Sequence, residues 1–131
     1  MSKMATPEGK SFLDTNAAKE GVTTTATGLQ ISHTKPGEGK TPAASDSVRV
    51  HYRGKLIDGT TFDSSYDRGM PIDFPLSGVI AGWTEALQLM QEKGKAQVVI
   101  PPELGYGERG AGGVIPPNAV LVFDIELLSV L

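Results

Sequence analysis

The chain contains no cysteine, which excludes a disulfide framework, a thiolate nucleophile and a cysteine-based zinc site. Its formal net charge of -3 at pH 7 gives no basic footprint for nucleic acid. No apolar run approaches the roughly 20 residues that span a bilayer, and no basic amphipathic stretch suits a membrane surface. The predicted partners therefore include neither nucleic acid nor a membrane.

Histidine is also scarce, and the sequence offers no nucleophile beside a base. His33 and His51 stand alone on predicted strands, without a second ligand at metal spacing, so we interpret both as ordinary sheet or surface residues. No phosphate loop or dinucleotide fingerprint is present. Asp124 and Glu126 could form a carboxylate pair, but a solvated strand face is the preferred interpretation. We predict neither a metal nor a cofactor.

The first residues carry no apolar region of the kind that opens a secretory signal. We expect the start of this chain to fall inside a longer protein. A chain without cysteine suits both reducing and oxidising compartments, so the composition leaves the localisation unknown.

Residues 6–20 have the signature of a helix, which Thr6 can cap and in which Pro7 suits the first position. Its apolar residues are few, so it would bury little surface. Two interpretations stay open: a solvated N-terminal arm, or the end of a longer helix that joins another domain. The predicted division is an N-terminal helical arm at 1–21 and a main domain at 22–131.

Beyond the arm, alternating apolar and polar residues between short turn sequences predict a series of strands, and Asp58-Gly59 predicts a hairpin turn. One amphipathic helix is predicted to start near Trp83 and to end at Lys93 and Gly94. A lone helix must bury its apolar stripe, and a sheet face is the available partner. The fold class is therefore α+β, an antiparallel β-sheet wrapped around one amphipathic helix. The predicted strands are 28–33, 48–53, 60–62, 72–76, 96–100 and 119–131, and the apolar helix positions are Trp83, Ala86, Leu87 and Met90.

A glycine-rich loop between residues 101 and 118 is too long to be a simple connection and is typical of a functional segment. We expect an ordered flap over a site, with apolar anchors at Leu104, Tyr106, Val114 and Ile115. Tyr106 lies inside this loop, and Trp83 opens the helix. Neither place is a usual core position, so these two aromatic residues favour a pocket over ordinary core packing.

Several motifs occur in the order seen in one family, and together they resemble the FK506-binding (FKBP) type of peptidyl-prolyl cis/trans isomerase. The resemblance runs from about Gly28 to Leu131. Residues 9–30 resemble the bacterial macrophage-infectivity-potentiator and FkpA-like members, in which a long helix leads to a dimerisation domain. The motifs are Val50-His51-Tyr52, Asp58-Gly59, Phe62-Asp63-Ser64-Ser65, Val79-Ile80, Gly82-Trp83, Leu104-Gly105-Tyr106-Gly107, Ile115-Pro116-Pro117-Asn118 and Leu121-Val122-Phe123-Asp124-Ile125.

The resemblance implies a site with Trp83 as its floor, Tyr106 as a rim donor and the Ile80 N–H as the group that binds a substrate carbonyl. Arg68 would pair with Asp63 or Tyr52, the alternative being a simple surface salt bridge. The Tyr106 hydroxyl could instead pin the flap to the protein's own backbone. The implied catalytic residues are Tyr52, Phe62, Asp63, Ile80, Trp83, Tyr106 and Phe123, and the implied substrate- or inhibitor-binding residues are Arg68, Ile72, Phe74, Val79 and Ile115.

The function implied is rotation of Xaa-Pro bonds in peptides and folding proteins, without covalent chemistry. The alternative is a non-catalytic peptide-binding or chaperone module that uses the same pocket. Expected partners are proline-containing peptides and unfolded protein clients, with macrolides such as FK506 and rapamycin as inhibitors. Ile72 replaces an aromatic of some members, and the loop tip at 108–113 is small, which weakens the expected grip on macrolides. This chain should be a monomer, with a homodimer forming only through an N-terminal domain, and the FkpA-like start favours a bacterial periplasm.

Overall fold

The computed structural model describes residues 3–131, so the first two residues of the predicted arm lie outside it. None of the helices within this range is long and apolar enough to span a lipid bilayer. The helices are α1 (Pro7–Ala17), α2 (Ser65–Arg68) and α3 (Ala81–Leu87), with the short 3-10 turns η1 (Leu76–Gly78), η2 (Pro102–Leu104) and η3 (Gly107–Arg109). The strands are β1 (Thr23–Thr24), β2 (Gln30–Lys35), β3 (Ser47–Leu56), β4 (Thr61–Ser64), β5 (Ile72–Pro75), β6 (Lys95–Ile100) and β7 (Leu121–Val130).

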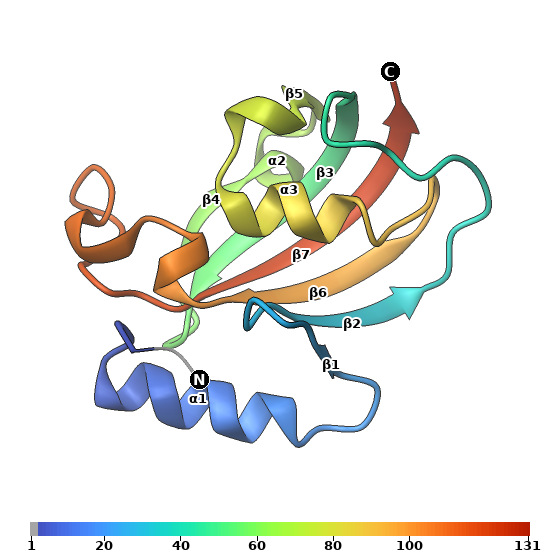
Figure 1. Ribbon diagram of the computed structural model, residues 1–131. Coiled ribbons are helices and arrows are strands. Elements are labelled where there is room, and N and C mark those ends of the chain that lie inside the picture. Colours follow the sequence, from blue (N-terminus) through green and yellow to red (C-terminus); the bar gives the residue numbers. More distant parts are fainter. Residues whose placement is uncertain (1–2) are drawn as a thin grey trace.

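The described strands form one antiparallel sheet in the order β1-β2-β6-β7-β3-β4, with β5 paired to β3 beyond the end of β4. Figure 1 shows α3 lying across one face of this sheet, in front of β3 and β7. The α+β prediction, an antiparallel sheet around one amphipathic helix with a helical N-terminal part, is confirmed.

Alternation along the central strands explains how the sheet and helix meet. Val48, Val50 and Tyr52 on β3 are buried, while the neighbouring Arg49 is exposed. The odd-numbered residues of β7 from Leu121 to Leu127 are buried in the same cluster. Strand side chains alternate between faces, so these two strands offer one continuous apolar surface to α3.

The predicted end of the main helix at Lys93 and Gly94 is wrong, because α3 ends at Leu87. Met90 is buried, but it lies in a turn after the helix, where its own N–H donates to the Leu87 carbonyl. Tertiary pairing explains the early end: the Lys93 N–H donates to the Leu127 carbonyl, 2.7 Å away, and Lys93 adopts a left-handed φ of 72°. Pairing with β7 overrides the local helical pattern.

The N-terminal helix also ends early, at Ala17, and it is not a solvated arm. Leu13 is buried against Val99 and Val122, whose side chains point to the sheet face opposite α3. Figure 1 accordingly shows α1 and α3 on opposite sides of the sheet. The expectation of a solvated arm is therefore wrong for this face of the helix, because Leu13 and the partly buried Phe12 pack on the back of β6 and β7.

A buried amide pair fastens α1 to the sheet and supplies a test. Asn16 Nδ2 donates to Gln30 Oε1 at 2.7 Å, and Gln30 Nε2 donates to the Leu13 carbonyl at 2.9 Å. Asn16→Ala should lower the free energy of unfolding by about 1–3 kcal/mol, because it leaves a buried acceptor without its donor. Urea unfolding would measure the loss against Asp14→Ala, an exposed control on the same helix that should change stability by less than about 0.5 kcal/mol. Equal losses would contradict a fastened arm.

Candidate active site

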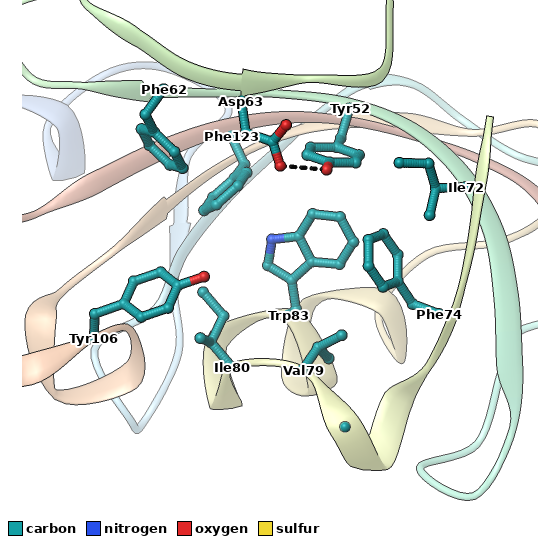
Figure 2. A pocket seen from close by; sticks show the side chains of 11 residues that line it. Tyr52, Phe62, Asp63, Ile72, Phe74, Val79, Ile80, Trp83, Tyr106 and Phe123 are labelled. Atoms are coloured by element: carbon teal, nitrogen blue, oxygen red, sulfur yellow. Dashed lines mark hydrogen bonds between the residues drawn. The ribbon is translucent and has the colours of Figure 1, made fainter. Parts of the chain in front are cut away.

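A cavity of about 580 Å³ opens beside the start of α3, and Figure 2 shows the side chains around it. Every residue that the sequence placed in the pocket lines it except Arg68 and Ile115, and Gly78 joins them. Strands β3, β4, β5 and β7, the η1–α3 connection and the glycine-rich loop all contribute. The lining residues are Tyr52, Phe62, Asp63, Ile72, Phe74, Gly78, Val79, Ile80, Trp83, Tyr106 and Phe123.

The indole of Trp83 is the centre of the aromatic set. Its ring meets those of Tyr52, Phe74 and Phe123 edge to face, with centroids 5.1, 5.4 and 5.4 Å apart. Such pairs each contribute about 0.5–1.5 kcal/mol beyond area burial. Trp83 is 4% exposed, so three rings hold it in place while its remaining surface faces the cavity.

A glycine makes room for one aromatic wall. Gly54 lies opposite Phe123 on one side and Asp63 on the other. A Cβ atom there would come within 2.6 Å of the Phe62 ring and 2.8 Å of the Phe123 ring. These two rings therefore cross over β3 at Gly54, with centroids 5.6 Å apart. Our sequence analysis missed this role, although a glycine inside an alternating strand signals close approach.

The polar wall consists of Tyr52, Asp63 and Arg68. The Tyr52 hydroxyl donates to Asp63 Oδ2 at 2.5 Å, which Figure 2 marks by a dashed line. Arg68, at the end of α2, donates to Asp63 Oδ1 at 2.5 Å and to the Tyr52 oxygen at 3.1 Å. Arg68 thus pairs with both predicted partners from behind the wall, without lining the cavity itself.

This network fixes the charge state of the wall. Burial raises the pKa of Asp63, but hydrogen bonds from Tyr52 and Arg68 and the charge of Arg68 outweigh it, so the pKa falls below its ordinary value. Burial and the neighbouring carboxylate raise the pKa of Tyr52. Over the neutral range, the wall therefore presents an ionised carboxylate that accepts from a protonated phenol.

The glycine-rich loop folds over one end of the cavity as an ordered segment. Ala111 and Ile115 exchange two backbone hydrogen bonds of 2.9 and 3.0 Å, which close its tip. Ile115 is buried in the main core and does not line the cavity. Val114 was expected to anchor the flap, but it is 58% exposed. The bridge takes its place as the anchor, because it turns Val114 outward.

Two hydrogen-bond donors of the site are unused by the rest of the described chain. The Tyr106 hydroxyl points toward the cavity in Figure 2 and has no hydrogen-bond partner within residues 3–131. The Ile80 N–H likewise donates to none of the described acceptors, although its carbonyl accepts from Trp83 and Thr84. Both donors are thus free for a bound molecule.

The arrangement suits binding and offers little for bond cleavage. Across residues 3–131, no three His, Asp or Glu side chains gather in a way that could hold a metal ion. His51, the histidine nearest the wall, bonds Ser65 and stacks on Tyr66 at 4.7 Å, so it does not enter the cavity. An aromatic cavity with two free donors at its rim can hold a ring and a carbonyl group.

Comparison with known families gives a match over most of the chain. The model described as FKBP-type peptidyl-prolyl cis-trans isomerase matches residues 38–128. A second model, described as the domain amino terminal to FKBP-type peptidyl-prolyl isomerase, matches residues 1–31.

Individual relatives agree with these matches. The chain is 58% identical over 124 residues to the FKBP-type 22 kDa peptidyl-prolyl cis-trans isomerase of Escherichia coli, covering 95% of this chain and 60% of that protein. It is 57% identical over 123 residues to the probable isomerase FkpA of Neisseria meningitidis, covering 94% of this chain and 45% of that protein. The crystal structure of FkpA from Escherichia coli superposes with a TM-score of 0.91 at 51% identity, covering 94% of this chain and 57% of that structure. The chain thus spans about half the length of these relatives.

Proposed function

This chain belongs to the FKBP-type peptidyl-prolyl cis-trans isomerase family, and we propose that it accelerates Xaa-Pro bond rotation by binding the twisted amide in the aromatic cavity. The observation that carries the proposal is the cavity floored by Trp83, with free donors on Ile80 and Tyr106 at its edge.

Rotation needs no bond to be made or broken. The amide must pass through a twisted, non-conjugated state, at a cost of about 18–20 kcal/mol. Catalysis then requires only that the protein bind the twisted amide more tightly than either planar form. Each 1.36 kcal/mol of this preference gives about tenfold in rate.

The cavity supplies that preference through its polarity. Twisting removes resonance, so the amide becomes less polar, and a dry aromatic cavity costs it less hydration than it costs a planar amide. The proline ring lies on Trp83, the Ile80 N–H holds one carbonyl of the substrate, and the Tyr106 hydroxyl holds another at the rim. The ring is thereby fixed while the preceding carbonyl turns.

The substrates we propose are prolyl segments of short peptides and unfolded proteins. An open cavity beside the sheet can admit a chain that continues on both sides of the proline. Macrolides would compete for the same cavity, with a weaker grip at Ile72, where the wall carries an aliphatic side chain. We further propose that this chain is a monomer, because α1 turns its apolar face onto the sheet.

The deciding experiment measures cis/trans exchange of a short Xaa-Pro peptide by NMR, with chelator present. We expect cis/trans exchange to be much faster than the uncatalysed reaction, which takes tens to hundreds of seconds. Proline-limited refolding and aggregation of an unfolded client, measured side by side, separate the alternatives. Suppressed aggregation without faster exchange would replace the isomerase proposal by a chaperone or peptide-binding module.

Tyr106→Phe tests the rim donor. Removing the hydroxyl keeps the ring, and a neutral hydrogen bond is worth about 0.5–1.5 kcal/mol, so kcat/KM should fall about two- to tenfold. The melting temperature should stay unchanged, since the hydroxyl has no partner in the described chain. A lowered melting temperature with unchanged turnover would instead make Tyr106 a pin for the flap.

A further inference from the structure

β3 has a gap in its strand pairing at the point where Tyr52 enters the cavity. On the edge away from β7, β4 pairs with β3 from Arg53 onward, and β5 pairs with it only as far as Val50. His51 and Tyr52 lie between these two partners. The N–H and C=O of Tyr52 face that edge, where no strand completes their hydrogen bonds. Buried backbone groups must nevertheless find partners.

A single side chain fills this gap. Ser65 Oγ accepts the Tyr52 N–H at 2.7 Å and lies 3.3 Å from the Tyr52 carbonyl oxygen, to which it donates. Ser65 Oγ is also 2.9 Å from His51 Nδ1. Because the hydroxyl has only one proton, its donation to the Tyr52 carbonyl goes with the tautomer in which His51 Nδ1–H donates to Ser65 Oγ. Ser65 is fully buried. Its hydroxyl thus does for Tyr52 what a paired strand would do.

Ser65 also belongs to the element that holds the other end of Tyr52. It is the first residue of α2, and Arg68 is the last. Arg68 reaches the Tyr52 hydroxyl at 3.1 Å and the Asp63 carboxylate at 2.5 Å. One short helix therefore grips the same tyrosine twice, by its main chain through Ser65 and by its hydroxyl through Arg68.

We propose that Ser65 is a positioning residue for the isomerase reaction, which holds Tyr52 so that the wall of Tyr52, Asp63 and Arg68 keeps its place beside Trp83. The inference rests on the proposed function of the cavity. Ser65 itself does not line the cavity, so it acts through Tyr52. The Tyr52 ring in turn touches the Trp83 indole edge to face, which links the serine to the cavity floor.

The neighbouring serine provides a matched control. Ser64 is also buried, at 4% exposure, and its Oγ caps α2 by accepting the Asp67 N–H at 3.2 Å. None of its side-chain hydrogen bonds reaches Tyr52. Ser64→Ala therefore removes a buried hydroxyl and weakens the same helix without releasing the tyrosine, which is the effect of a merely structural serine.

The experiment compares kcat/KM and the fluorescence of Trp83, the only tryptophan of the chain, in three variants beside the wild type. Ser65→Ala should lower kcat/KM about tenfold, since it frees two main-chain groups of a wall residue, and should shift the Trp83 emission. Ser64→Ala should keep kcat/KM within about threefold of the wild type and leave the Trp83 emission unchanged. Ser65→Cys conserves the buried volume with a weaker hydrogen-bonding group, so it should fold and lie between wild type and Ser65→Ala.

Equal losses of kcat/KM in Ser64→Ala and Ser65→Ala would overturn the positioning role while leaving the isomerase proposal intact. So would native turnover and native emission in Ser65→Ala or, should that variant not fold, in Ser65→Cys. If the wild type shows no catalysis, the proposed function fails, and the emission alone decides on Ser65. A shift confined to the Ser65 variants would then support its grip on Tyr52, and unchanged emission would refute it.

Discussion

Phe62→Ala should lower kcat/KM about ten- to a hundredfold, because full loss of an aromatic contact surface costs about 1.5–3 kcal/mol of binding. Phe62 lines the cavity and packs at the edge of the core while only partly buried, so its truncation removes less buried surface than that of a fully buried side chain. Its closest ring contact is Phe123. The melting temperature should therefore fall little. Peptide kinetics and thermal melts on the same sample measure the two effects.

Leu87→Ala is the matched opposite. Leu87 is fully buried on α3 and does not line the cavity. Its truncation should cost about 2–5 kcal/mol of stability, through lost burial and the space left behind. Turnover per folded molecule should stay within about twofold, since Trp83 keeps its three ring contacts. Equal melting shifts with equal activity losses in the two variants would count against the assignment of Phe62 to the site.

The sequence predicted the sheet and its strands because these depend on local patterns, whereas most of the cavity lining was implied by the resemblance to a family. Alternation places Val48 and Val50 beneath the helix, and the position of Tyr106 in a glycine-rich loop indicates that it is not a core residue. The resemblance to a family then joined residues that are far apart in the chain. Pairing across the sheet, as between Gly54 and Phe123, is not visible in local patterns.

The errors share one physical cause, which is tertiary contact overriding local preference. The pattern around Met90 reads as helix, yet the pairing of Lys93 with Leu127 ends the helix earlier. The arm looked solvated because a helix with few apolar residues gains little alone. The helix packs on the second face of the sheet, where Val99 and Val122 are apolar and would otherwise face solvent.

The role of Ser65 shows the same limit for polar residues. Serine beside a helix start predicts a cap, and Ser64 is that cap. Nothing local distinguishes it from Ser65, whose importance comes from the gap between β4 and β5 on the edge of β3. Such a gap exists only once the strand pairing is known.

The polar wall makes a prediction about pH. The pKa of Asp63 lies below its ordinary value of 3.8, so the carboxylate stabilises the fold above that value and loses this contribution as the pH falls through its folded pKa. The Arg68 and Asp63 side chains are 47% and 40% exposed, so solvent screening keeps the contribution to stability small. The value of the network is the geometry it imposes on Tyr52. Since no proton is transferred, kcat/KM should stay flat from about pH 5 to about pH 9.

Asp63→Asn should lower kcat/KM about tenfold, because it removes the charged acceptor that holds the Tyr52 hydroxyl and Arg68 in place, and solvent screening keeps such a bond near the lower end of about 1.5–3 kcal/mol. The amide keeps the shape of the carboxylate and can still accept from the Tyr52 hydroxyl, so the fold should persist. Arg68 loses its charged partner, and the wall loses the carboxylate to which both the Tyr52 hydroxyl and Arg68 donate. The exchange rate measured by NMR for the wild type should fall toward that of the variant only at a pH below 3.8, the ordinary pKa of the group, because the pKa of Asp63 is lowered in the fold. The rate of the variant should stay flat over the same range. Arg49→Gln is the control, since it breaks the exposed Arg49–Asp73 pair on the same sheet, outside the cavity. A variant as active as wild type at neutral pH, or an acid limb shared by both proteins, would show that the charge of Asp63 has no part in turnover.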